Sequence, residues 1–122
     1  MAGTWTLTVR AGSRVERERF PELEEALRAV DTRLEDLRRD ARRGTARVFS
    51  REIEPVAQVA ARLELSGPGG LLRGAHAGLD VRGDGSVEAW SGRVRKRVLE
   101  QRDGESPLAA LRRSFSSADR SR

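Results

Sequence analysis

The sequence predicts an α+β fold: a mainly antiparallel sheet of five to six strands with one long helix packed on one face, plus a short C-terminal helix. Three observations indicate this fold. Apolar and polar residues alternate strictly from Thr4 to Arg10, as in a half-buried strand. Between residues 21 and 43, apolar residues recur at spacings of three and four, as on one face of a helix. The segment Gly83-Asp84-Gly85 is typical of a hairpin turn, and hairpins join antiparallel strands.

The first two strands form a predicted hairpin. Trp5, Leu7 and Val9 share one face of the first strand, opposite three threonines. Gly12 suits a tight turn because glycine adopts positive φ at no steric cost. Residues 14–20 then return as a charged second strand, which we expect to be solvated on one side.

A helix is predicted over residues 21–43. Pro21 suits the first helical position, where a missing N–H leaves no hydrogen bond unmade. Arginines crowd the last turn, where the helix dipole favours cations, and Gly44 is the expected terminator. The apolar stripe consists of Leu23, Leu27, Val30, Leu34, Leu37 and Ala41.

Three or four further strands are expected after this helix. Residues 45–54 resemble a strand that Pro55 interrupts, and the alternation resumes at Val59 and ends at Leu65. A glycine-rich loop follows, and residues 71–78 are predicted to be irregular.

The second predicted hairpin is centred on the Gly83-Asp84-Gly85 turn. Its first strand starts at Leu79, and its second runs back from Val87. Gly92 is interpreted as a bulge, after which the strand continues toward Leu99. The predicted order of elements is therefore ββαββββα.

A short amphipathic helix is predicted near the C-terminus. Ser106 is its expected N-cap and Pro107 its first residue. Its apolar residues are Leu108, Leu111 and Phe115. Residues 116–122 carry no apolar anchor and are predicted to form a disordered tail. Residues 1–115 are then expected to form a single domain.

Composition excludes several classes of site. The chain of 122 residues has no cysteine, which excludes disulfides, thiolate nucleophiles and cysteine-ligated metals. No apolar stretch reaches the length of a transmembrane helix, and residues 1–5 lack the charged and apolar regions of a signal peptide. We therefore expect a cytoplasmic protein with no membrane contact.

The positive charge is unevenly distributed. Only Lys96 among the 24 basic residues is a lysine, and the abundance of arginine, alanine, glycine and valine is typical of a GC-rich bacterial genome. Residues 1–92 hold 15 arginines and 15 acidic residues, whereas residues 93–122 hold nine basic and four acidic residues, so the net charge of +5 arises entirely in the C-terminal quarter. Such asymmetry bears on partners rather than on the fold.

The ionisable residues do not form a recognisable catalytic set. His76 is the only histidine, and the sequence supplies no obvious partner for it, so we interpret it as an ordinary partly exposed histidine. The carboxylates of the long helix lie within three or four residues of arginines, as in a solvated face with weak ion pairs. We therefore expect no enzyme, and no catalytic, cofactor-binding or metal-binding residue is assigned.

The densest basic cluster provides the one candidate partner-binding site. It consists of Arg93, Arg95, Lys96 and Arg97, with Trp90 nearby. In a strand, alternate arginines of this segment would project from one face and form a basic, partly aromatic surface suited to phosphates or bases. The alternative interpretation is a charged edge strand that guards against aggregation.

Two binding functions follow. The first is a small non-enzymatic protein-interaction or accessory module of unknown partner, acting by strand addition or self-association through an edge strand. The second is an electrostatic binder of nucleic acid or a ribonucleoprotein that uses the basic C-terminal quarter. The neutral first 92 residues favour the first. No small-molecule substrate is evident.

Overall fold

The N-terminal hairpin has the strands that the alternation predicts. The computed structural model describes residues 4–47, 59–68, 76–92 and 96–120. Strand β1 (Trp5–Ala11) pairs antiparallel with β2 (Arg14–Phe20) through a two-residue turn, in which Ala11 lies opposite Arg14. Gly12 has a φ of 61°, whereas among the described residues only glycines have positive φ, so Ser13 does not. Positive φ at the first central residue alone is typical of a type II′ turn.

The long helix α1 (Leu23–Arg47) starts and ends later than predicted. Pro21 precedes the helix rather than occupying its first position, and the carbonyl of Glu22 accepts the hydrogen bond from the Ala26 N–H. At the other end the helix passes through Gly44. The strand expected from residue 45 is therefore wrong for residues 45–47, and residues 48–54 and Pro55 lie outside the described part of the chain.

The second half of the chain supplies the remaining strands. They are β3 (Val59–Ser66), β4 (His76–Arg82), β5 (Val87–Ser91) and β6 (Arg97–Val98). Strand β4 begins three residues before the predicted start at Leu79, so residues 76–78 are not irregular. The turn between β4 and β5 lies where it was predicted, and Gly85 has a φ of 88°.

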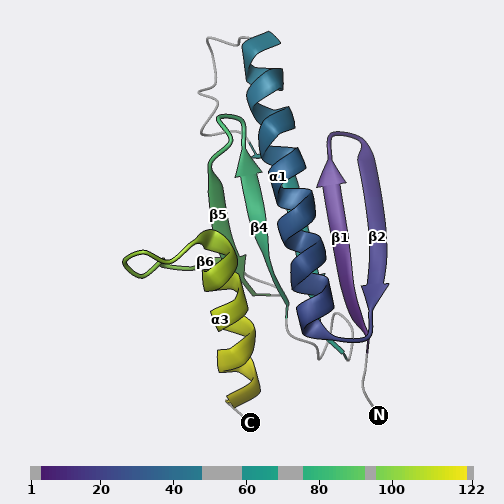
Figure 1. Cartoon of the computed structure of the whole chain (residues 1–122), viewed down its shortest axis with the longest axis vertical. Helices are drawn as coiled ribbons and strands as arrows, with labels where there is room; N and C mark the ends of the chain where they lie inside the picture. Colours follow the sequence, from purple (N-terminus) through teal and green to yellow (C-terminus); the bar gives the residue numbers. More distant parts are fainter. Residues whose placement is uncertain (1–3, 48–58, 69–75, 93–95, 121–122) are drawn as a thin grey trace.

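The strands form one six-stranded antiparallel sheet in the order β2-β1-β3-β4-β5-β6. Strand β1 lies between its hairpin partner β2 and β3, which follows α1 in the chain. Strand β2 is therefore one edge of the sheet and β6 is the other (Figure 1). The predicted α+β class, the antiparallel sheet and the order ββαββββα are confirmed.

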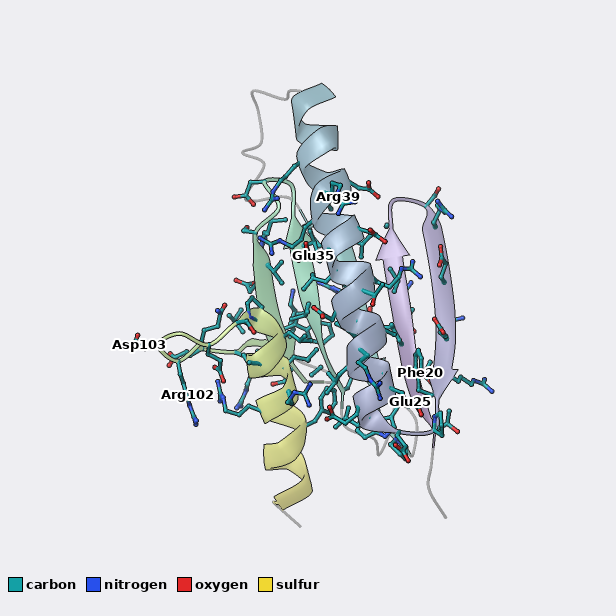
Figure 2. The ribbon with its side chains drawn as sticks, in the orientation of Figure 1. Phe20, Glu25, Glu35, Arg39, Arg102 and Asp103 are labelled. Atoms are coloured by element: carbon teal, nitrogen blue, oxygen red, sulfur yellow. The ribbon has the colours of Figure 1, made fainter. Side chains whose placement is uncertain are left out.

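The C-terminal helix α3 begins as predicted and is longer. It runs Pro107–Arg120, and the Ser106 hydroxyl accepts a hydrogen bond from the Ala109 N–H at 3.1 Å, the geometry of an N-cap. The helix continues past Phe115 into the first part of the segment expected to be a tail. In Figure 2, Arg102 and Asp103 lie at the tip of the loop that precedes α3 and projects from the sheet.

Both helices pack on the same face of the sheet. Helix α1 contacts β1, β2, β3 and β4, whereas α3 contacts β4 and β5, and strand β2 lies at the edge of the sheet (Figure 1). The core contains alternate residues of the central strands, such as Leu7, Leu63 and Leu79, together with the apolar faces of both helices. The intervening residues of these strands point to the opposite face, which we call the open face because no described helix covers it.

Candidate functional site

Strand β2 presents an unpaired edge. It is seven residues long and exposed from Arg14 to Arg19, and among the described strands it pairs only with β1. The opposite edge strand, β6, has only two residues. A long edge strand carries a row of free backbone N–H and C=O groups that can pair with another chain, whereas a very short one offers almost none.

The hairpin register determines which backbone groups of β2 are free. In a two-residue hairpin the residues that flank the turn exchange hydrogen bonds, and bonded pairs then alternate along the ladder. Ala11 and Arg14 flank this turn, so Glu16 and Glu18 also bond to β1. Residues 15, 17 and 19 direct their N–H and C=O groups away from the sheet.

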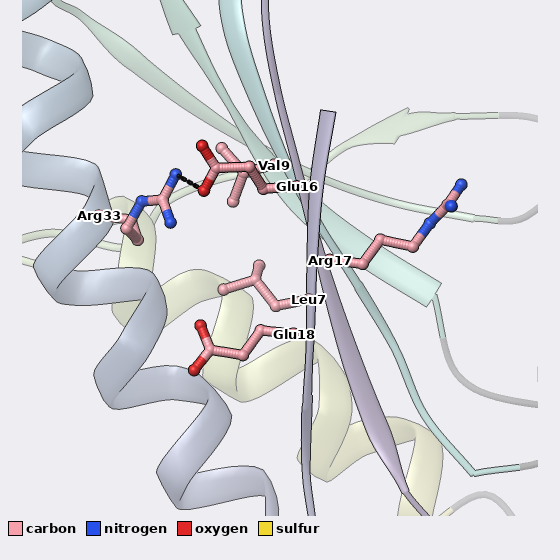
Figure 3. A pocket seen from close by; sticks show the side chains of 6 residues that line it. All are labelled: Leu7, Val9, Glu16, Arg17, Glu18 and Arg33. Atoms are coloured by element: carbon pink, nitrogen blue, oxygen red, sulfur yellow. Dashed lines mark ion pairs between the residues drawn. The ribbon is translucent and has the colours of Figure 1, made fainter. Parts of the chain in front are cut away.

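The side chains of β2 divide by charge between the two faces from residue 16 to residue 19, whereas Arg14 lies on the same face as Glu16. Glu16 lies opposite Val9 and Glu18 lies opposite Leu7, and both of those partners are core residues, so the two glutamates point to the helix side. Arg17 lies opposite Thr8 and points to the open face. Figure 3 shows this division: both glutamate side chains project toward α1 and Arg17 projects away from it.

A groove separates the helix side of β2 from α1. Its larger section has a volume of about 290 Å³ and is lined by Val9, Ala11, Arg14, Glu16, Arg33, Asp36, Leu37 and Asp40. Its smaller section, of about 160 Å³, lies beside Leu7 and Glu18 (Figure 3). Arg33 crosses the groove from α1 and pairs with Glu16 at 2.9 Å. The groove therefore has an apolar floor and a charged rim that a neighbouring strand would adjoin.

A second polar cluster lies on the open face and is centred on Asp80. The Asp80 side chain is fully buried and accepts two hydrogen bonds from Arg62, at 2.8 and 3.1 Å. Lys96 also donates to it, as does the indole Nε1 of Trp90 at 3.0 Å. Burial alone raises the pKa of the Asp80 carboxyl, but the hydrogen bonds from Arg62 and Lys96 outweigh that effect and hold the pKa below its ordinary value.

The Asp80 cluster accounts for two of the predicted partner-binding residues. Trp90 is 3% exposed, and its ring lies across Gly78, where a Cβ atom would stand 2.8 Å from the indole. The ring offers little free surface for stacking on a base. Lys96 directs its ammonium group to Asp80 and lies 5.6 Å from the Trp90 ring centroid.

The other predicted residues do not join this cluster. Arg97 is exposed on β6 opposite Ser91, on the other face of the sheet from the pair formed by Trp90 and Val98. Arg93 and Arg95 lie outside the described residues. Sequence reasoning missed the role of Asp80, and the single carboxylate between Leu79 and Val81 was the only local signal.

His76 has a neighbour that the sequence did not reveal. Its Nε2 lies 3.6 Å from the Glu64 carboxylate, and its ring meets Trp90 edge-on with centroids 5.4 Å apart. Both ring nitrogens are buried without a hydrogen-bond partner in the part of the chain that is described. Glu64 also accepts a hydrogen bond from Arg10 at 3.2 Å. A histidine and one engaged carboxylate do not by themselves make a nucleophile–base pair.

Comparison with protein-family models, with curated proteins and with solved structures finds no match for this chain. Across the described ranges, no group of three or more histidine, aspartate or glutamate side chains is placed to hold a metal ion. Neither described helix combines the length and the apolar composition needed to cross a bilayer. The edge strand β2 and its groove are therefore the candidate site that the geometry defines best.

Proposed function

We propose that this chain is a non-enzymatic protein-interaction module that accepts an extended segment of another protein as a seventh strand beside β2. The observation that carries the proposal is the free edge of β2, whose residues 15, 17 and 19 direct their backbone groups outward. Strand addition uses such groups for affinity and uses the alternating side chains for specificity.

The energetics of an added strand support this function. Each backbone hydrogen bond contributes about 0.5–1.5 kcal/mol net, so a partner that pairs with three outward residues gains several such contributions at once. The α1–β2 groove adjoins the same edge and offers Val9 and Leu37 as apolar contact for side chains on the helix side. The short edge β6 offers no comparable ladder.

The alternative is electrostatic binding of nucleic acid through the basic C-terminal quarter. It rests on the net charge of +5 arising in residues 93–122. The predicted binding residues in this quarter begin at the basic cluster beside Trp90. Among the described members of that cluster, Lys96 is bound to Asp80 and Trp90 is buried, so Arg97 is the exposed cation. The alternative therefore has less support than strand addition at β2.

A matched pair of variants tests the proposal. Arg17→Pro and Arg17→Ala both remove the same exposed side chain, but only Arg17→Pro removes an outward N–H, and proline is tolerated on the solvent side of an edge strand. Peptides selected for binding from a random displayed library should bind Arg17→Ala and should not bind Arg17→Pro. They should also slow hydrogen exchange at the amides of residues 15, 17 and 19.

The opposite result would contradict strand addition at β2. Peptides that bind both variants equally and leave those three amides unprotected would place the interaction elsewhere. If these peptides also bound Arg97→Gln more weakly than the parent, the binding site would lie at β6.

A further inference from the structure

From residue 16 to residue 19, strand β2 carries one sign of charge on each face, whereas Arg14, beside the turn, lies on the helix side next to Glu16. Arg17 and Arg19 point to the open face, and we call them the arginine row; Glu16 and Glu18 point to the helix side, and we call them the glutamate row. All four residues are exposed. Between residues 16 and 19, the edge therefore presents an incoming strand with negative charge on the helix side and positive charge on the open face.

The sheet itself does not neutralise the arginine row. The cross-strand neighbours of Arg17 and Arg19 on β1 are Thr8 and Thr6, both uncharged. Neither arginine forms an ion pair with any described residue. The nearest acid in the same row as Arg17 is Glu64, two strands away and already bonded to Arg10.

The helix side near the edge has an excess of negative charge. Glu16 is paired with both Arg33 and Arg14, and Asp36 lies 3.9 Å from Arg39, but Glu18 has no ion pair with a described residue. The charged side chains that line the groove on this side are the carboxylates Glu16, Glu18, Asp36 and Asp40 and the guanidinium groups of Arg14 and Arg33. With Arg39, which pairs with Asp36, these groups amount to four negative charges against three positive ones, and Glu18 is the carboxylate on β2 that a basic side chain of a partner could meet.

This arrangement disfavours pairing of β2 with β2 of a second copy. The two-fold axis that joins two identical edge strands into one regular antiparallel sheet runs perpendicular to the sheet, so each face of one copy continues into the same face of the other. The arginine rows would then meet on the open face and the glutamate rows on the helix side. In the register that overlaps the two strands completely, Arg17 lies opposite Arg17 of the other copy and Glu16 lies opposite Glu18, and like charges directly opposite each other destabilise a strand pair. Registers shifted toward the turn bring Arg14 opposite a glutamate, but they pair fewer residues of the two strands.

We infer that the strand bound at β2 belongs to a different protein and carries acidic residues toward Arg17 and Arg19 and basic residues toward Glu16 and Glu18. Acidic and basic residues must alternate along such a strand, because successive side chains point to opposite faces. This inference rests on the proposed function and adds the chemical class of the partner.

Synthetic peptides test the alternation with the unmodified chain. The probe is a blocked peptide of alternating glutamate and lysine, and its control has the same composition with all glutamates preceding all lysines. Blocking both termini removes the end charges. The alternating peptide should bind roughly three- to thirtyfold more tightly than the control, because only its side chains can meet both rows with opposite charge.

A matched pair of charge reversals tests the arginine row. Arg17→Glu and Arg97→Glu change the net charge equally, and both residues are exposed on edge strands, at opposite ends of the sheet. Arg17→Glu should weaken binding of the alternating peptide roughly three- to thirtyfold, and Arg97→Glu should not. In Arg17→Glu, a peptide with lysine in place of the facing glutamates should regain the lost affinity.

Two results would overturn the inference. If bound peptides protect the amides of residues 15, 17 and 19 but alternating and block peptides bind equally, strand addition stands and the charge code is wrong. If a single-stranded oligonucleotide binds the chain, and if this binding is lost in Arg17→Glu but not in Arg97→Glu, the arginine row contacts phosphates instead. Absence of amide protection by any peptide would instead remove the proposed function itself.

Discussion

Trp90 donates its indole N–H to the Asp80 carboxylate at 3.0 Å, on the face of the sheet opposite both described helices. The two residues lie on neighbouring strands, and the bond ties an aromatic ring to the one fully buried carboxylate among the described residues. Arg62 completes the arrangement, with its guanidinium carbon 5.3 Å from the Trp90 ring centroid. The open face at β4 and β5 is thus held together by hydrogen bonds and ring contacts, away from the exposed edge at β2.

We expect the Asp80→Asn variant to lose stability. The amide keeps the shape of the side chain but turns one acceptor into a donor and leaves Arg62 and Lys96 without their anion, so the free energy of unfolding should fall by about 1–3 kcal/mol. Urea titration followed by Trp fluorescence measures the loss. Asp103→Asn, in the projecting loop, is the control and should change the free energy by less than about 0.5 kcal/mol. Equal stability of the two variants would show that the cluster contributes nothing.

Glu105 should make stability dependent on acid pH. Its carboxylate accepts hydrogen bonds from the Arg113 side chain and from the Arg102 N–H, and these lower its pKa from an ordinary 4.5 to about 2. A carboxyl whose pKa is lower in the folded state adds stability above its unfolded pKa and loses it as the pH falls. The midpoint of thermal unfolding should therefore drop between pH 4.5 and pH 2.

The Glu105→Gln variant provides the comparison for this pH dependence. Glutamine cannot titrate, so the variant should be less stable than the parent near neutral pH and should show a shallower decline below pH 4.5. Glu100→Gln, at a side chain that accepts no hydrogen bond from the described residues, should retain the parent's decline. An unchanged slope in Glu105→Gln would assign the acid sensitivity to other carboxylates, among them Asp80.

Hydrogen exchange in the free protein should alternate along β2. The amides of Glu16 and Glu18 bond to β1 and should exchange slowly, whereas those of residues 15, 17 and 19 face solvent and should exchange fast. Amide-resolved exchange by NMR measures this pattern directly. Uniform protection of all the β2 amides in a dilute sample would mean that the edge is already covered.

Neutralising the edge should make the protein associate. Replacing Glu16, Arg17, Glu18 and Arg19 together by threonine retains strand propensity and removes the repulsion between like-charged rows. Light scattering should then show dimers or larger species, while the parent remains monomeric at the same concentration. A parent that dimerises as readily as the variant would contradict the repulsion that we attribute to the two rows.

Local pattern was sufficient for most of the elements and insufficient for their ends. The alternation of Trp5, Leu7 and Val9 predicted β1 because a strand that buries one face must repeat every two residues. Gly44 predicted a helix end that does not occur, because α1 continues to Arg47 despite the weak helix propensity of glycine. His76 was assigned to an irregular segment because its glycine neighbours hid a strand whose Gly78 accommodates the Trp90 ring.

The order of elements and the alternating charges of residues 16–19 follow from local pattern, since both depend on neighbours within a few positions. The pairing of β1 with β3 across the whole of α1 emerges only in the folded chain, and it makes β2 an edge that exposes its alternating charges to a partner. Only in the folded chain, too, does Asp80 gather Arg62, Trp90 and Lys96 from other strands and segments. Strand pairings between distant segments follow from how the complete sheet buries its core, and no local period of residues encodes that choice.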